Sequence, residues 1–105
     1  MAAIAIDDLT RSVVALLGAC GVGAADAEDT AAALVTTDAM GVFTHGTKLL
    51  AGYVRKLRGG GYDPAGRPAV EREGPAWAIV DGRAALGQVG STFAVRLAIG
   101  KARQC

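Results

Sequence analysis

The sequence has few of the side chains on which binding and catalysis usually depend. It contains one histidine, two cysteines and one tryptophan. Its acidic and basic residues nearly balance, at 10 and 11, so net charge does not favour nucleic acid or an anionic membrane as a partner. No apolar run approaches the roughly 20 residues of a transmembrane helix. We therefore expect a cytoplasmic protein with neither a nucleic-acid nor a membrane partner.

The sequence around the two cysteines argues against a metal site and against lipidation. Cys20 and Cys105 have no companion cysteine or histidine at ligand spacing, which argues against a metal site. The segment 17–20, Leu-Gly-Ala-Cys, is similar to a bacterial lipoprotein cleavage box. However, Asp7 and Asp8 stand where a signal peptide has basic residues, and the apolar run before the box is short. These flanks disfavour lipidation.

What the chain does contain is helical periodicity in its first half. With 105 residues it is long enough for one domain with a modest core. A first amphipathic helix, ended by the glycines at 21 and 23, is indicated by an apolar stripe of Leu9, Val13, Leu16, Leu17 and Cys20. A second helix closes at Gly41 and opens with the acidic residues Asp26, Glu28 and Asp29. Its predicted inner face consists of Ala31, Leu34, Val35 and Ala39.

Asp38 falls on this same inner face of the second helix. A carboxylate there is costly unless a donor pairs with it. We expect it to accept a hydrogen bond from the turn at Thr44 and His45 or from a neighbouring backbone amide. The alternative is a partly exposed acid near a helix end.

The single histidine lies in the stretch GVFTHGTKLL, residues 41–50. Thr44 is a good N-cap, and the apolar spacing that follows predicts a third helix from about 45 to 58, ended by the glycines at 59–61. On that helix His45 lies off the apolar stripe, with Lys48 and Arg55 on the same side. The imidazole is therefore predicted to lie outside the core, either as an ordinary exposed histidine or as a site residue.

Beyond the glycines the pattern changes to short β-type runs. Residues 69–73 and 76–81 flank Gly74-Pro75 and predict a β-hairpin or two neighbouring strands. The second run is apolar on both faces, which is typical of an internal strand covered on both sides. A last helix follows Gly87, with one apolar side formed by Val89, Phe93 and Leu97 and another formed by Val95, Ile99 and Ala102.

The expected fold is therefore α+β, with three N-terminal helices (7–58), then a strand pair and a C-terminal helix (68–105). The second apolar side of the last helix needs a further covering. We therefore expect an incomplete piece of a larger domain.

In sequence order, these residues form a pattern that is similar to a known family. The pattern consists of Leu34-Val35, Asp38, Gly41, Thr44-His45-Gly46, Leu50, Tyr53, Gly60, Pro64, Val80-Asp81-Gly82, Leu86-Gly87 and Phe93-Ala94. With it the chain resembles the malate/L-lactate dehydrogenase family from about residue 9 to 105. Members of this family have a non-Rossmann oxidoreductase fold. They interconvert 2-hydroxy and 2-keto acids, or reduce cyclic imino acids, with NAD or NADP.

The resemblance implies roles for four residues. Thr44 and His45 would border the active site as a hydroxyl-imidazole pair for proton relay or substrate contact. Tyr53 matches a family tyrosine near the substrate, although its position suits core packing equally well. Many members carry an arginine that binds the substrate carboxylate, and Leu49 occupies that position here. Lys48, beside it, is the remaining basic candidate for substrate binding, although it points about a quarter turn away on a helix.

Family members are much longer than this chain. The resemblance therefore implies an N-terminal portion of a homodimeric enzyme. Its NAD or NADP would be bound mainly by residues beyond the chain, and this portion alone would have no activity. The alternative is a standalone helical interaction domain without catalysis.

Overall fold

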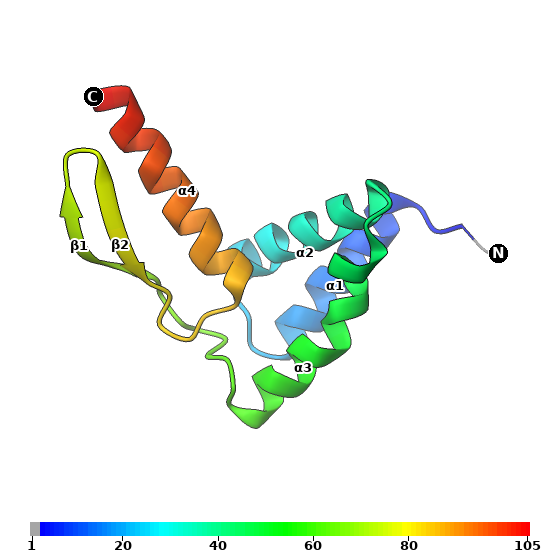
Figure 1. Cartoon of the computed structure of the whole chain (residues 1–105). Helices are drawn as coiled ribbons and strands as arrows, with labels where there is room; N and C mark the ends of the chain where they lie inside the picture. The colour runs from blue at the N-terminus through cyan, green and yellow to red at the C-terminus, as the bar shows by residue number, and fades with distance from the viewer. Residues whose placement is uncertain (1–2) are drawn as a thin grey trace.

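The computed structural model describes residues 3–105 (Figure 1). Its helices are α1 (Ile6–Ala19), α2 (Ala24–Ala39), α3 (Leu50–Gly59) and α4 (Gly87–Gln104). Between α3 and α4, strand β1 (Ala69–Gly74) pairs antiparallel with β2 (Trp77–Asp81), with an irregular register between Val70 and Arg72. The α+β class and the order of the elements are therefore confirmed.

The core lies mainly between α1 and α2. Val13 and Leu17 of α1 are buried together with Ala31, Leu34 and Val35 of α2. Burial of each large aliphatic side chain contributes roughly 1.5–3 kcal/mol. These residues belong to the predicted apolar stripes, so the stripes identified the packing faces of both helices.

Two residues of the predicted stripes lie outside this core. Leu16 is 39% exposed because it lies at the edge of the apolar stripe of α1. Ala39 is exposed because α2 ends at that residue and the chain leaves the helix through Gly41. The predicted buried faces of α1 and α2 therefore each included one residue that is exposed.

The third predicted helix begins later than expected. Two 3₁₀ turns, Phe43–His45 and Thr47–Leu49, precede α3. Thr44 lies inside the first turn and caps no helix, while Leu49 precedes α3 without a side-chain cap. The prediction of a helix from 45 with Thr44 as its N-cap was therefore wrong. The amide of Thr47 donates to the carboxylate of Asp38, a contact that the spacing of apolar residues does not reveal.

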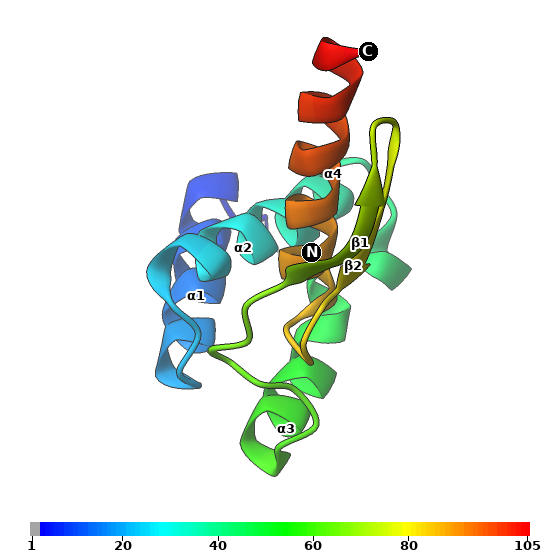
Figure 2. The same ribbon diagram turned by 90° about the vertical axis from the view of Figure 1, so that its left-hand side faces the viewer.

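The arm formed by α4 and the β-hairpin extends away from the three-helix body (Figures 1 and 2). The Cα radius of gyration is 15.1 Å, whereas a compact domain of this length has roughly 13 Å. Lys101 joins α4 to strand β1 of the hairpin. Its ammonium donates to the carbonyl of Gly74 at 2.8 Å and pairs with the carboxylate of Glu73 at 2.7 Å. The large radius of gyration reflects this projecting arm, which the other helices do not enclose.

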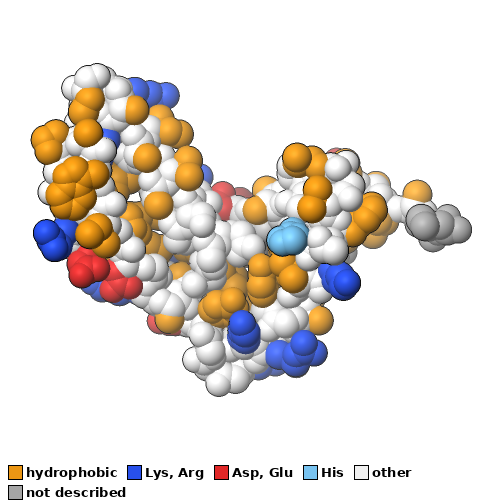
Figure 3. Space-filling model, in the orientation of Figure 1, with side chains coloured by type: hydrophobic (Ala, Val, Ile, Leu, Met, Phe, Trp, Pro, Cys, Tyr) orange, Lys and Arg blue, Asp and Glu red, His pale blue; other side chains and the backbone are white. Residues whose placement is uncertain are grey.

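The arm leaves apolar side chains uncovered (Figure 3). Within the described residues β2 pairs with β1 alone, and its Trp77 and Ile79 are 49% and 46% exposed. On α4, Val95 and Ile99 are 57% and 47% exposed. The expectation of a strand covered on both sides was therefore wrong for this part of the chain, since α4 lies against one face of β2 only. The two-sided apolar character of α4 is confirmed.

None of the helices within residues 3–105 combines the length and the hydropathy that a bilayer-spanning segment needs.

Candidate functional site

The candidate site lies on the connection between α2 and α3. Gly41, with φ +82°, ends α2 in a left-handed conformation. Its amide donates to the carbonyl of Asp38 at 2.9 Å, and the amide of Val42 donates to the carbonyl of Thr37 at 3.1 Å. This pair of bonds is a helix C-terminal motif that reverses the chain direction. The following residues, including Thr44 and His45, are thereby held at the end of the helical body.

Thr44 and His45 form the expected hydroxyl-imidazole pair. The Oγ1 atom of Thr44 lies 2.9 Å from Nδ1 of His45, and both residues are exposed. Nδ1 is thus engaged by a neighbour, so Nε2 is the ring nitrogen that faces other partners. When the threonine hydroxyl donates to Nδ1, the neutral ring carries its proton on Nε2, and when Nδ1–H donates to the hydroxyl oxygen, Nε2 is an acceptor. The pair can therefore present either a donor or an acceptor to a bound molecule.

Asp38 is half-buried and is paired with Thr47. Its two carboxylate oxygens lie 3.3 and 3.2 Å from the backbone nitrogen of Thr47, and the hydroxyl of the same residue also donates to it. The expected bond from a neighbouring backbone amide is therefore present, and the donor is Thr47. Thr47 belongs to no pattern that predicted a site residue. A hydroxyl residue directly after the glycine of the His-Gly pair is the signal that could have indicated it.

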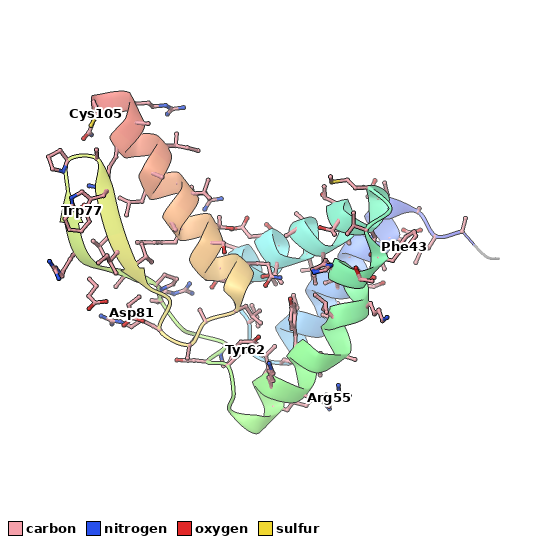
Figure 4. All side chains as sticks on the ribbon, in the orientation of Figure 1. Phe43, Arg55, Tyr62, Trp77, Asp81 and Cys105 are labelled. Carbon is pink, nitrogen blue, oxygen red and sulfur yellow. The ribbon has the colours of Figure 1, made fainter. Side chains whose placement is uncertain are left out.

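Lys48 is exposed and borders a shallow hollow of about 480 Å³. The hollow is also lined by Ile4, Leu9, Asp38, Phe43 and Thr47. Phe43 lies beside the N-terminal end of α1 in Figure 4. Lys48 is the basic residue of this lining and Asp38 the acidic one, while Ile4, Leu9 and Phe43 make the rest largely apolar. Leu49, at the family arginine position, is half-buried and offers no such charge.

Tyr53 of α3 is half-buried and packs, together with Tyr62, against the hydrophobic core. Its ring meets that of Tyr62 edge-to-face, with centroids 6.1 Å apart. Its hydroxyl accepts a hydrogen bond from Nε2 of Gln88 at 3.1 Å, which joins α3 to α4. Gln88 is a second residue that the sequence did not indicate, and its Oε1 is buried without a partner. The phenolic proton of Tyr53 is still available to a ligand.

The four predicted site residues, Thr44, His45, Lys48 and Tyr53, therefore lie in three separate groups of contacts. Thr44 and His45 touch each other, Lys48 shares a hollow with Asp38 and Thr47, and Tyr53 contacts Tyr62 and Gln88.

Three glycine turns of the described residues lie at helix C-termini, an unfavourable place for the phosphates of a nicotinamide cofactor. Gly21, Gly41 and Gly60 have positive φ and end helices, where carbonyl oxygens face outward and repel an anion. At the start of α4, the amides of Val89 and Gly90 already donate to the carbonyl of Leu86. Nor does the described part of the chain group three or more His, Cys, Asp or Glu residues that could hold a metal ion.

Comparison with known proteins assigns this arrangement to a family. The model of the malate/L-lactate dehydrogenase family matches residues 4–105. Over 98 residues the chain is 38% identical to a malate dehydrogenase of Pyrococcus abyssi, covering 93% of the chain and 27% of the relative. Over 93 residues it is 35% identical to an L-sulfolactate dehydrogenase of Methanocaldococcus jannaschii, covering 89% of the chain and 27% of the relative. The chain therefore spans about a quarter of the length of these curated relatives.

Solved structures give the same result. The malate dehydrogenase of Pyrococcus horikoshii superposes with a TM-score of 0.94 at 38% identity, covering 96% of this chain and 29% of that one. The sulfolactate dehydrogenase of Methanocaldococcus jannaschii superposes with a TM-score of 0.90 at 33% identity, covering 93% and 28%. The open arm is therefore an arrangement that longer dehydrogenases share. These matches lend no support to a standalone interaction domain.

Proposed function

Because this chain belongs to the malate/L-lactate dehydrogenase family, we propose that it forms the N-terminal portion of an NAD(P)-dependent oxidoreductase that interconverts 2-hydroxy and 2-keto acids. The observation that carries the proposal is the bonded pair of Thr44 and His45 on an exposed loop. We expect the whole enzyme to be a cytoplasmic homodimer, as the family resemblance implies.

The chemistry of a keto-acid reduction explains why the pair is useful. When the keto carbon is reduced, its oxygen becomes an alkoxide that must gain a proton. In its protonated, imidazolium form the ring can donate its Nε2 proton to the alkoxide and remain as a neutral ring, whose Nδ1–H donates to the hydroxyl oxygen of Thr44. In the reverse direction, Nε2 of that neutral ring accepts the proton of the hydroxy acid. Thr44 fixes the ring so that the same nitrogen faces the substrate throughout. We assign the acid-base role to His45 and the orienting role to Thr44.

Lys48 and Tyr53 are the proposed substrate contacts. The relatives are named for malate and sulfolactate, each of which carries a second anionic group beside its carboxylate. With Leu49 at the family arginine position, Lys48 is the cation of this loop that can pair with such a group. Tyr53 would donate its phenolic proton to a substrate oxygen while Gln88 holds its oxygen atom. We therefore favour a dicarboxylate-like substrate.

The cofactor is expected to be held mainly by residues outside this chain, because the three glycine turns described above are an unfavourable place for its phosphates. The role of the chain is then to hold the substrate and to move its proton. On this basis residues 1–105 alone are expected to lack dehydrogenase activity.

The proposal is tested by a chimera. Residues 4–105 replace the matching segment of the Pyrococcus horikoshii malate dehydrogenase, and oxidation of NADH and of NADPH is followed with oxaloacetate and with pyruvate. We expect a folded chimera to reduce at least one of these acids, and oxaloacetate faster than pyruvate. The control is the same relative without its matching segment, which should be inactive. A chimera that folds and binds cofactor but reduces neither acid would contradict the proposal.

A further inference from the structure

The loop that carries His45 is attached to Asp38 at both of its ends. At the beginning, the backbone carbonyl of Asp38 accepts the amide of Gly41 at 2.9 Å. At the end, its carboxylate accepts the amide and the hydroxyl of Thr47. Residues 41–47 therefore form a loop that is closed on one residue of α2.

Gly46 shows how closely the carboxylate approaches this loop. A Cβ atom on Gly46 would lie 1.7 Å from Oδ1 of Asp38 and 3.1 Å from the carbonyl oxygen of Leu34. The α-carbon next to His45 thus rests directly on the carboxylate, and glycine is the residue that allows this contact. The position of the Asp38 side chain and the path of the backbone after His45 are therefore determined together.

His45 itself has little packing to hold it. The residue is exposed, its amide donates to the carbonyl of Val42 at 3.2 Å, and its ring is bonded to the adjacent Thr44. Both of these partners belong to the same loop. The direction of the imidazole therefore depends on the backbone of the loop, and the loop depends on Asp38.

We propose that Asp38 is a positioning residue for His45, and that its bonds to Thr47 hold the Gly46 backbone in the one path that directs the imidazole toward the substrate. The proposal rests on the proposed function for the role of His45, while the attachment of the loop can be measured without turnover. In this role Asp38 acts on His45 through the backbone of the loop and takes no part in proton transfer.

The single histidine makes the test unambiguous, because every imidazole signal in the nuclear magnetic resonance spectrum of residues 1–105 belongs to His45. The variants are Thr47→Val, which removes the hydroxyl and keeps the shape, and Thr47→Ser, which keeps the hydroxyl. Thr37→Val is the matched control, because its hydroxyl bonds within α2 to the carbonyl of Ala33. The readouts are the χ1 populations of His45, the shift of its Nδ1 and the exchange rate of the Thr47 amide.

We expect Thr47→Val to spread the His45 side chain over several rotamers. The hydrogen-exchange rate of the backbone amide of residue 47 should rise about tenfold. Thr47→Ser and Thr37→Val should match the unmodified chain. Unchanged His45 populations in a folded Thr47→Val variant would overturn the proposal. If that variant does not fold, Asp38→Asn decides by the same readouts, because it keeps the shape but removes the negative charge and one of the two acceptor oxygens, which weakens the bonds to Thr47. An inactive chimera together with the expected spectra would refute the proposed function and leave the positioning role intact.

Discussion

Gly46→Ala is predicted to destabilise the protein by about 2–5 kcal/mol. The added methyl group would occupy the place of a carboxylate oxygen of Asp38, with the Leu34 carbonyl 3.1 Å away. The carboxylate must move and lose its bonds to Thr47. Loss of a hydrogen bond to a charged group costs about 1.5–3 kcal/mol, and overpacking adds about 1–3 kcal/mol. The reduced flexibility of the unfolded chain returns about 0.4–1 kcal/mol.

The matched control is the same substitution at Gly52, in the interior of α3. No atom outside its own helix and chain neighbours lies within 4 Å of a Cβ built there, so alanine should stabilise the helix by about 0.5–1 kcal/mol. Urea and thermal unfolding followed by circular dichroism measure both variants. Each kcal/mol corresponds to a shift of roughly 4–8 °C in Tm for a domain of this size. Equal stability of Gly46→Ala and the unmodified chain would refute the reasoning about the carboxylate contact.

Three further predictions concern the arm and the chain alone. Lys101→Met should lower stability by about 1–2 kcal/mol in urea titrations, because the side chain of Lys101 is only 16% exposed and loses its bonds to Gly74 and Glu73; an unchanged midpoint would contradict this. Residues 1–105 should self-associate through the exposed apolar face of α4, and the double variant Val95→Glu, Ile99→Glu should sediment as a monomer at concentrations where the unmodified chain does not. A monomeric unmodified chain would be the contrary result. Residues 1–105 should also fail to bind NADH or NADPH in fluorescence titrations, and micromolar binding would show that the cofactor site lies within this chain.

The sequence predicted the elements whose patterns are regular. The apolar stripes of α1 and α2 and the turn residues of the hairpin were sufficient, because helices and hairpins leave periodic or local signals. The start of α3 was not predictable in this way. It depends on the contact between Asp38 and Thr47, which are nine residues apart and belong to no periodic pattern.

The candidate site was predictable only where its contacts are local in the sequence. Thr44 and His45 are adjacent, so their pairing follows from the local sequence once the turn forms. The bond between Tyr53 and Gln88 joins residues 35 positions apart and depends on how α4 docks against the helical body. The uncovered face of β2 likewise depends on what packs against the arm, which the apolar pattern alone does not specify.

The assignment of His45 as the acid-base group is tested most directly by the His45→Gln variant of the chimera. Turnover of oxaloacetate is measured alongside the unmodified chimera and a Lys56→Gln control, whose exposed side chain lies over the ring of Tyr62. Because His45 is exposed, the variant should fold as before. Loss of acid-base catalysis should lower kcat by about a hundredfold, with KM changed far less. A His45→Gln chimera that turns over at the unmodified rate would contradict the account.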